Sequence, residues 1–302
     1  MKLARWTTLL IVVLLVAVTF AAGACSSKGT AQPTPTPAPS EGSIDIKSGS
    51  IIGAKVIIDG IDTSSVTPYV ATHVAVGNHT VTLEYAHYKW RTENVSVTAG
   101  DPPAYVNWAL TYADDQTLTI QPNASEGKDS CVNAYWPDKD RSTEASVYAG
   151  GDGDGSARYS RIYIQFSVSA IPSTAVIESA ALRLDYYYSY SKNVQAPIGV
   201  YRVTSTWNES TVTWNNQPTF NTTAIDTVLV PTTATYTFLS WDVTSLVKSW
   251  SISRYVRNVN CGMVLMDTDE STDEGWKAFQ SSDATDASVR SKLVITYYDP
   301  MP

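Results

Sequence analysis

Apolar and polar residues alternate with a period of two along most of the chain after residue 43, which is the spacing of β-strands that bury one face. Turn-forming pairs interrupt the alternation at Asp59-Gly60, Gly77-Asn78 and Gly100-Asp101. No helical period is present between residues 42 and 110. The pattern therefore predicts an antiparallel β-sandwich with strands around these apolar positions: Ile44 and Ile46; Val56 and Ile58; Val74 and Val76; Val81, Leu83 and Tyr85; Val95 and Val97; Val106, Trp108 and Leu110.

The alternation continues after residue 113 with one exception. Further strands are predicted around Leu118 and Ile120; Ile162, Ile164, Phe166 and Val168; Ala180, Leu182, Leu184 and Tyr186; Leu293, Ile295 and Tyr297. The exception has apolar residues at i, i+3, i+4 and i+7, namely Val243, Leu246, Val247 and Trp250. This spacing predicts one short amphipathic helix over a sheet, capped by Asp242 or Thr244, with Trp250 in the core.

The first 24 residues have the pattern of a secretory signal. Lys2 and Arg5 precede the apolar residues 9–18, and small residues lead to Cys25. This stretch resembles a lipobox with Ala22 where Leu is usual, which implies lipidation of Cys25 and a membrane anchor at the cell surface. An ordinary cleaved signal and an uncleaved signal anchor are the alternatives, although the apolar run is shorter than a spanning helix requires.

Residues 25–41 form a linker rich in Pro, Thr and Ser. The tract Gln32–Pro39 favours extended polyproline II geometry and has no apolar face to bury, so we expect a semi-rigid spacer. The whole chain carries 29 acidic against 21 basic residues, a formal net charge of -8. This balance argues against a nucleic-acid partner.

Residues 42–112 resemble the PEGA domain. The matching features are Gly42-Ser-Ile-Asp-Ile, Gly53-Ala54, Asp59-Gly60, Thr67-Pro68 and the run from Val76 to Leu83. The resemblance implies a small, non-catalytic extracytoplasmic module. Asp59 is accordingly interpreted as a turn residue and His79 as a structural one.

Residues 113–302 resemble the DNRLRE domain, a disaggregatase-related type grouped with carbohydrate-binding modules. The most distinctive match is Trp207-Asn-Glu-Ser-Thr-Val-Thr-Trp214-Asn-Asn-Gln-Pro218, and Arg161–Phe166 and Trp241–Val247 also match. The resemblance implies a jelly-roll-like sandwich. The predicted fold is thus all-β, with a small PEGA-like β-sandwich and a larger one that carries one short helix.

Catalytic groups are scarce in the second module. It contains no His, so Ser-His-Asp and Cys-His triads are excluded there. Acidic residues gather between Asp267 and Glu274, but a glycosidase needs two carboxyls at a defined separation, which a sequence does not give. We therefore expect no enzymatic activity.

Calcium is the one candidate cofactor. Asp152 and Asp154 in a Gly-rich run, and Asp267 and Asp269 in the acidic run, are the candidate ligands. Neither run is an EF-hand, because the twelfth position is Tyr163 or Ala278 instead of Glu.

Aromatic residues are the stronger candidates for ligand contact. The chain has 18 Tyr and 9 Trp against 5 Phe, and such rings combine a flat apolar face with a polar tip. Trp136 and Trp276 lie in polar, loop-like surroundings, and Tyr187 shares the outer face of its strand with Arg183. These four are the candidate carbohydrate-binding residues, whereas Trp207, Trp214, Trp241 and Trp250 are expected in the core or in structural motifs.

Cys131 and Cys261 are the two cysteines left after Cys25. In an oxidising compartment an even pair suggests a disulfide, and two buried unpaired thiols are the alternative.

Together these features predict an exported, membrane-anchored cell-surface protein that binds a cell-wall, matrix or extracellular polysaccharide. The linker and the PEGA-like module would act as its stalk. An envelope adhesion protein that binds another protein is the first alternative, and an exposed apolar patch would favour it. A polysaccharide-degrading enzyme is the second, and paired carboxylates in a cleft, or a Tyr beside Arg or Lys, would favour it.

Overall fold

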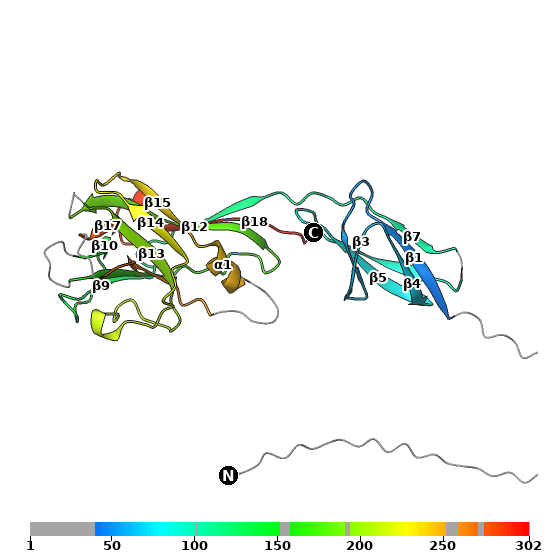
Figure 1. The fold of residues 1–302 in the computed structure, drawn as a ribbon, viewed down its shortest axis with the longest axis horizontal. Helices are drawn as coiled ribbons and strands as arrows, with labels where there is room; N and C mark the ends of the chain where they lie inside the picture. Colours follow the sequence, from blue (N-terminus) through cyan, green and yellow to red (C-terminus); the bar gives the residue numbers. More distant parts are fainter. Residues whose placement is uncertain are drawn as a thin grey trace, which may run out of the picture. The chain divides into compact units, whose positions relative to one another are not determined.

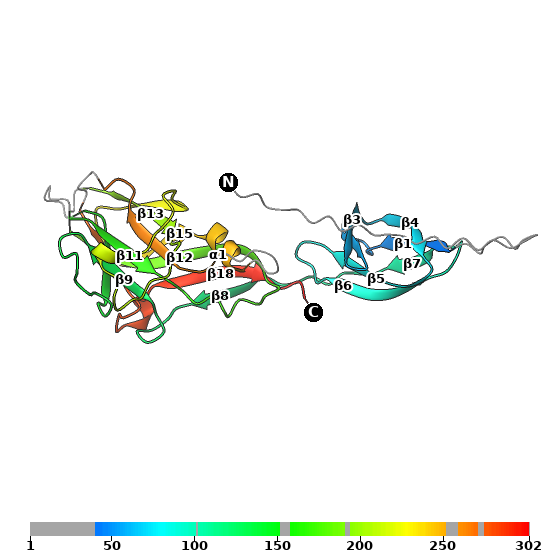
Figure 2. The same cartoon turned by 90° about the horizontal axis from the view of Figure 1, so that it is seen from below.

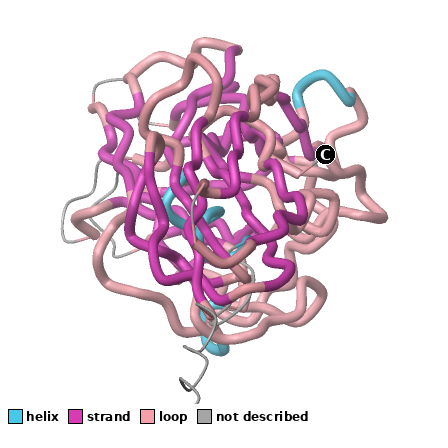
Figure 3. Tube along the Cα trace, turned by 90° about the vertical axis from the view of Figure 1, so that its right-hand side faces the viewer, coloured by secondary structure: helices cyan, strands magenta, loops and turns pink. Residues whose placement is uncertain are grey.

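The computed structural model describes residues 40–100, 102–151, 158–190, 194–251, 259–270 and 275–301. These residues form an all-β fold with one short α-helix, as predicted, and strands make up most of its regular structure (Figure 3). No helix in these ranges is both long and apolar enough to cross a membrane.

The N-terminal sandwich packs a three-stranded sheet, ordered β4-β1-β7, against a four-stranded sheet, ordered β3-β2-β5-β6 (Figure 1). Its strands are β1 (Glu41–Lys47), β2 (Lys55–Ile58), β3 (Ile61–Val66), β4 (Tyr69–Ala75), β5 (Gly77–Glu84), β6 (Arg91–Val97) and β7 (Ala104–Asn107). Most of the predicted inward residues are buried, and Ile44, Ile46, Val56, Val81 and Leu83 are fully so. The predicted Val76 and Tyr85 instead lie outside the strands and are exposed.

Three further details of this sandwich differ from the prediction. Strand β3 was not expected, because its polar, largely exposed residues show no apolar face. The pair β1–β7 is parallel, whereas the other pairs of this sandwich are antiparallel. Gly77 and Asn78 begin strand β5 instead of forming a turn. The turn at Asp59-Gly60 is as expected: both residues have positive φ, 51° and 76°, which suits a type I′ hairpin.

The C-terminal sandwich has two larger sheets. One is ordered β10-β17-β12-β18-β8, with β15 also pairing with β12, and the other is ordered β14-β13-β16-β11-β9. Figure 2 shows β12 and β18 side by side, with β8 at the edge. The strands are β8 (Gln116–Ile120), β9 (Asp129–Asn133), β10 (Ser146–Ala149), β11 (Ser160–Ile164), β12 (Val176–Ser189), β13 (Ala196–Arg202), β14 (Asp226–Val230), β15 (Thr237–Asp242), β16 (Met263–Asp267), β17 (Lys277–Gln280) and β18 (Lys292–Tyr298).

The main core of this sandwich lies between the two sheets. Trp241 is fully buried there and donates its indole N–H to the Ile198 carbonyl over 2.8 Å. Helix α1 (Thr244–Ser251) packs against β12 and buries Leu246, Val247 and Trp250. The amide of Thr244 donates to the Asp242 carboxylate, which begins the helix as the sequence predicted.

A second apolar cluster covers the other face of the β9-containing sheet. Its strand residues, Val132, Tyr163, Tyr201 and Val264, alternate with residues that face the main core. Trp207 and Trp214 pack onto this cluster, so both have the structural role expected from the sequence.

The expected disulfide between Cys131 and Cys261 is not formed, and both cysteines are free and buried. Cys131 belongs to the main core, whereas Cys261 belongs to the cluster on the opposite face of the same sheet. A strand points alternate side chains to opposite faces, so the sheet itself separates the two sulfurs. Burial raises the pKa of the Cys131 thiol to about 12, so this thiol remains protonated.

Candidate functional site

An open cavity of about 330 Å³ lies at the end of the C-terminal sandwich where β9, β10, β11, β12 and β17 approach one another. The residues that line it come from the ends of these strands and the segments beside them: Asn133, Tyr135, Trp136, Arg141, Tyr148, Ser160, Tyr190 and Trp276. Five of these eight side chains are aromatic, so the cavity is a ring-lined recess on a rigid sheet framework.

The first wall is built by the turn after β9. The side-chain oxygen of Asn133 accepts hydrogen bonds from the amides of Tyr135 and Trp136, over 2.8 and 3.2 Å. Its side-chain nitrogen donates to the Ser160 hydroxyl on β11. This turn presents both rings to solvent, with Trp136 52% exposed and Tyr135 49% exposed. The two rings meet edge to face at 4.7 Å.

The second wall centres on Trp276. Its ring stacks on Tyr190 with a centroid distance of 5.1 Å and meets Tyr148 edge to face at 4.9 Å. Gly150 permits this packing: a Cβ there would lie only 3.1 Å from the Gly275 carbonyl oxygen and 3.3 Å from Trp276 Cα. The φ of Gly150, 105°, also favours glycine.

Three basic side chains surround the first wall. Arg141 is 9% exposed, lies 5.4 Å from the Trp136 ring centroid, and donates from Nη1 to both oxygens of Glu144. Its Nε is buried and has no hydrogen-bond partner among the described residues. Lys139 also pairs with Glu144, and Arg158 lies 4.0 Å from the ring centroid of Tyr135. Among the described residues, Lys139 and Arg141 are thus held by Glu144, while Arg158 packs on the face of Tyr135.

This arrangement suits binding by stacking. The flat faces of Trp136 and Trp276 can cover the C–H face of a sugar ring, while Arg141, Asn133 and Ser160 supply polar groups for hydroxyls. None of the eight lining residues carries a carboxyl, so they do not provide the acid–base pair that glycoside hydrolysis requires.

Two of the four predicted carbohydrate-binding residues, Trp136 and Trp276, line this cavity together. Tyr187 does not line it, and its hydroxyl donates to the Ser146 hydroxyl over 2.7 Å. Arg183 lies on β12 opposite Ser240 and Lys292, with its guanidinium 6.0 Å from the Phe238 ring. The structure therefore places Arg183 apart from the lining residues.

The remaining lining residues were not predicted. Tyr135 directly precedes Trp136, and Tyr190 ends the Tyr-rich run 186–190, so sequence proximity was the available signal for both. Tyr148, Asn133 and Arg141 gave no such signal, because only the pairing of their strands and loops brings them to the cavity.

The predicted calcium ligands remain a prediction. Asp152 and Asp154 lie outside the described residues. Asp267 is buried at the end of β16, and its carboxylate accepts the amide of Asp269 over 3.0 Å. Glu270, in the same acidic run, pairs with Arg161, which gives this carboxylate a structural partner.

A second group of carboxyls lies where β9 begins. Asp129 is 2% exposed; its Oδ2 accepts the Ser282 amide over 3.0 Å, and its Oδ1 has no partner among the described residues. Glu209, from the distinctive Trp-containing motif, accepts the amide of Asp129 over 2.8 Å. Burial, with the charge of the nearby Asp283 carboxylate adding to it, raises the pKa of Asp129 to about 6 and that of Glu209 to about 7.

A larger cavity of about 940 Å³ has a different character. Its lining is mostly small polar and aliphatic residues from the segment 165–173, and its two aromatic members, Phe166 and Trp250, are buried in the main core. Among its described lining residues, therefore, neither aromatic ring is exposed for a flat ligand to stack on.

An open, ring-lined recess on a β-sandwich is typical of a sugar-binding module. The family comparison agrees. Residues 109–297 match carbohydrate-binding module family 96, and because this match covers more than half of the chain, the chain belongs to that family. Residues 42–107 match the PEGA domain.

Other comparisons add little. No curated protein matches the chain. Among solved structures, that of infectious bursal disease virus Gx strain matches with 10% identity and a TM-score of 0.19. The match covers 91% of this chain and 59% of that chain, so this chain spans less than two thirds of that chain's length. A similarity this low carries no structural or functional argument.

Proposed function

We propose that this protein is an exported cell-surface protein that binds a polysaccharide in the cavity between Trp136 and Trp276. One observation carries the proposal: five aromatic rings from four segments of the chain line one open recess. Tyr135, Trp136 and Tyr190 are about half exposed and offer apolar faces that a sugar ring can cover. The membership in a family of carbohydrate-binding modules supports the same ligand class.

The test is retention of the full chain on immobilised neutral and acidic polysaccharides. Trp136→Ala is the main variant, because Trp136 is 52% exposed and its loss should not disturb the core. A central aromatic contact typically contributes about 2 kcal/mol or more, so we expect binding to weaken by about thirtyfold. Tyr236→Ala is the matched control, since Tyr236 is 74% exposed and does not line the cavity.

Two outcomes would contradict the proposed site. Equal loss in both variants would mean that the effect is not specific to the cavity. Retention of the Trp136→Ala and Trp276→Ala variants at parental strength would place the ligand elsewhere. If the parent chain binds no polysaccharide, a protein partner becomes the better hypothesis.

A polysaccharide-degrading activity is the second candidate, favoured by Arg158 beside Tyr135. Arg158 lies over the face of the ring, which suits cation–π packing more than activation of the tyrosine hydroxyl. An assay for new chain ends on each retained polysaccharide separates the two functions. Binding without release supports a binding module, whereas release supports an enzyme.

Export and anchoring form a separate part of the proposal. The signal-like residues 1–24, Cys25 and the Pro-rich linker support a lipid-anchored protein whose N-terminal sandwich acts as a stalk. In this arrangement Cys25→Ser moves the protein from the membrane fraction to the soluble fraction. An unchanged membrane association in the variant would contradict lipidation. Retention assays with and without a chelator test whether the proposed calcium supports binding.

A further inference from the structure

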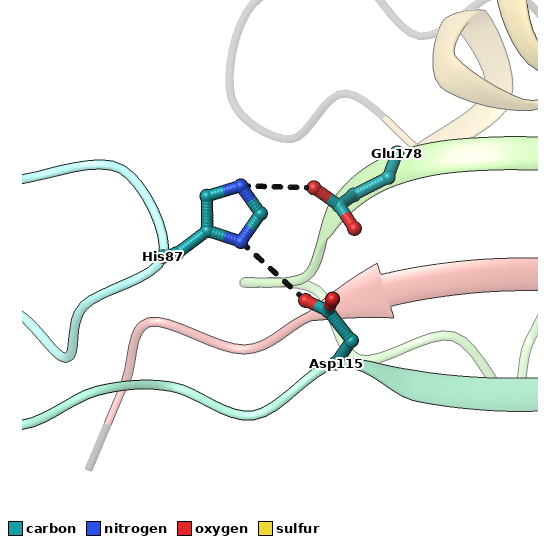
Figure 4. A group of neighbouring side chains, drawn as sticks. All are labelled: His87, Asp115 and Glu178. Atoms are coloured by element: carbon teal, nitrogen blue, oxygen red, sulfur yellow. Dashed lines mark ion pairs between the residues drawn. The ribbon is translucent and has the colours of Figure 1, made fainter.

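His87, Asp115 and Glu178 come together from three separate segments of the chain (Figure 4). His87 lies between β5 and β6 of the N-terminal sandwich, Asp115 directly precedes β8, and Glu178 lies on β12. One ligand atom from each residue lies within 4.8 Å of the other two. The imidazole stands between the two carboxylates, with Nδ1 3.4 Å from Asp115 and Nε2 3.1 Å from Glu178.

The position of the histidine ring is fixed by its surroundings. The ring stacks on Tyr298 with a centroid distance of 4.7 Å and lies nearly parallel to Tyr112 at 6.2 Å. The backbone of His87 adopts a φ of 60°, and its carbonyl accepts the amide of Ala113 over 2.9 Å. A ring held in this way loses little further freedom when it binds a ligand.

The electrostatic surroundings favour a cation. Among the described residues, neither Asp115 nor Glu178 forms an ion pair with Lys or Arg. Asp114, directly before Asp115, adds a third carboxylate in the same segment. Two carboxylates thus share a single imidazole, which leaves an excess of negative charge.

We propose that His87, Asp115 and Glu178 bind a divalent transition-metal ion, with Zn²⁺ the best match. One imidazole nitrogen and two carboxylate oxygens are a donor set that zinc accepts, with water completing the shell. Calcium prefers an all-oxygen shell, so it should bind there more weakly. The side chains are 37%, 47% and 28% exposed, in the order named, so an ion has access from solvent.

The geometry also shows which side chain must move. A metal uses the lone pair of one ring nitrogen, whereas the two carboxylates now face different nitrogens. Glu178 can keep its place beside Nε2, while Asp115, the most exposed of the three, rotates to reach the same ion. The bound ion would then join a residue of the PEGA match to two residues of the family 96 match.

The test is calorimetric titration of Zn²⁺ and of Ca²⁺ into the metal-stripped full chain and its variants. We expect one zinc site, at least about tenfold weaker after His87→Gln or Glu178→Gln, and much weaker calcium binding. His73→Gln is the matched control, because His73 has a similar φ of 58° and does not belong to the group. The chain has only three histidines, so NMR should show zinc perturbing the imidazole signals of His87 and not those of His73 or His79.

Two results would overturn the proposal. Zinc affinity that is unchanged in His87→Gln would place the ion elsewhere. No zinc binding by the parent chain, together with lower thermal stability of His87→Gln, would show that the imidazole only bridges the two carboxylates.

Discussion

The buried carboxyl of Asp129 should make the stability of the C-terminal sandwich depend on pH. Burial raises the pKa of this group from 3.8 to about 6 in the folded protein. Below pH 3.8 the carboxyl is protonated in both states, so it does not alter the free energy of unfolding. As pH rises from about 4 to 6, the unfolded chain ionises first, and the folded state becomes progressively less stable relative to it.

The size of the effect follows from the same pKa values. Each tenfold change in the protonation equilibrium corresponds to about 1.4 kcal/mol, so a pKa raised from 3.8 to about 6 lowers the free energy of unfolding by about 3 kcal/mol at pH 7. The substitution Asp129→Asn removes the charge. The asparagine oxygen can still accept the Ser282 amide, so the hydrogen bond at that position is kept.

Urea unfolding of the full chain, followed by tryptophan fluorescence at several values between pH 4 and pH 8, measures this difference. We expect the stability of Asp129→Asn relative to the parent to rise by about 2.4 kcal/mol from pH 4 to pH 7. Asp114→Asn, at an exposed position, is the control for replacing one carboxyl by an amide. Parallel curves for the parent and Asp129→Asn would refute the reasoning, because they would mean that Asp129 is charged in the folded protein at no cost.

Three further predictions follow from other parts of the structure. Trp241→Ala should lower the free energy of unfolding by about 3–5 kcal/mol in a denaturant titration, because its buried indole would leave a cavity in the main core; a loss below 1 kcal/mol would contradict its central packing. Alkylation of the unfolded, unreduced chain should label both Cys131 and Cys261, and protection of both would indicate a disulfide. The hydrogen-bonded ion pair of His79 with Asp59 raises the pKa of His79 above 6.5 in the folded protein. The pair therefore stabilises the folded state fully below pH 6.5, and this stabilisation is lost as pH rises through the raised pKa of the folded protein. His79→Gln should therefore remove this decline from the thermal denaturation profile of the chain, and an unchanged profile would show that the pair does not contribute.

The fold was predictable where residues face a core. Alternation located the buried strands because Ile44, Val81 and Leu182 must all point inward, and the helical spacing around Trp250 located helix α1. Strand β3 has no apolar face to bury, so alternation did not locate it. The parallel pairing of β1 with β7 cannot be inferred from the sequence of either strand alone. Periodicity gives the orientation of side chains, but it does not give the partner of a strand.

The site was predictable only in part for a similar reason. Trp136 and Trp276 stood out because large rings occurred in polar segments. Strict alternation along β12 favoured Tyr187, but the register between β12 and β17 shifts between Tyr186 and Tyr188. Such an irregularity changes which side chains share a face, and here Tyr190, beyond the end of the strand, lines the cavity.

The parallel pairing of β1 with β7 determines how the N-terminal sandwich responds to mechanical force. Four residue pairs, from Ile44–Ala104 to Lys47–Asn107, join the two strands. A pull applied between Ser40 and the segment after Asn107 draws β1 and β7 in opposite directions along their own length. The hydrogen bonds between them are then loaded in shear and must break together, instead of one after another as in an unzipping hairpin. A tethered chain that holds a polysaccharide under flow would therefore resist extension at this pair of strands.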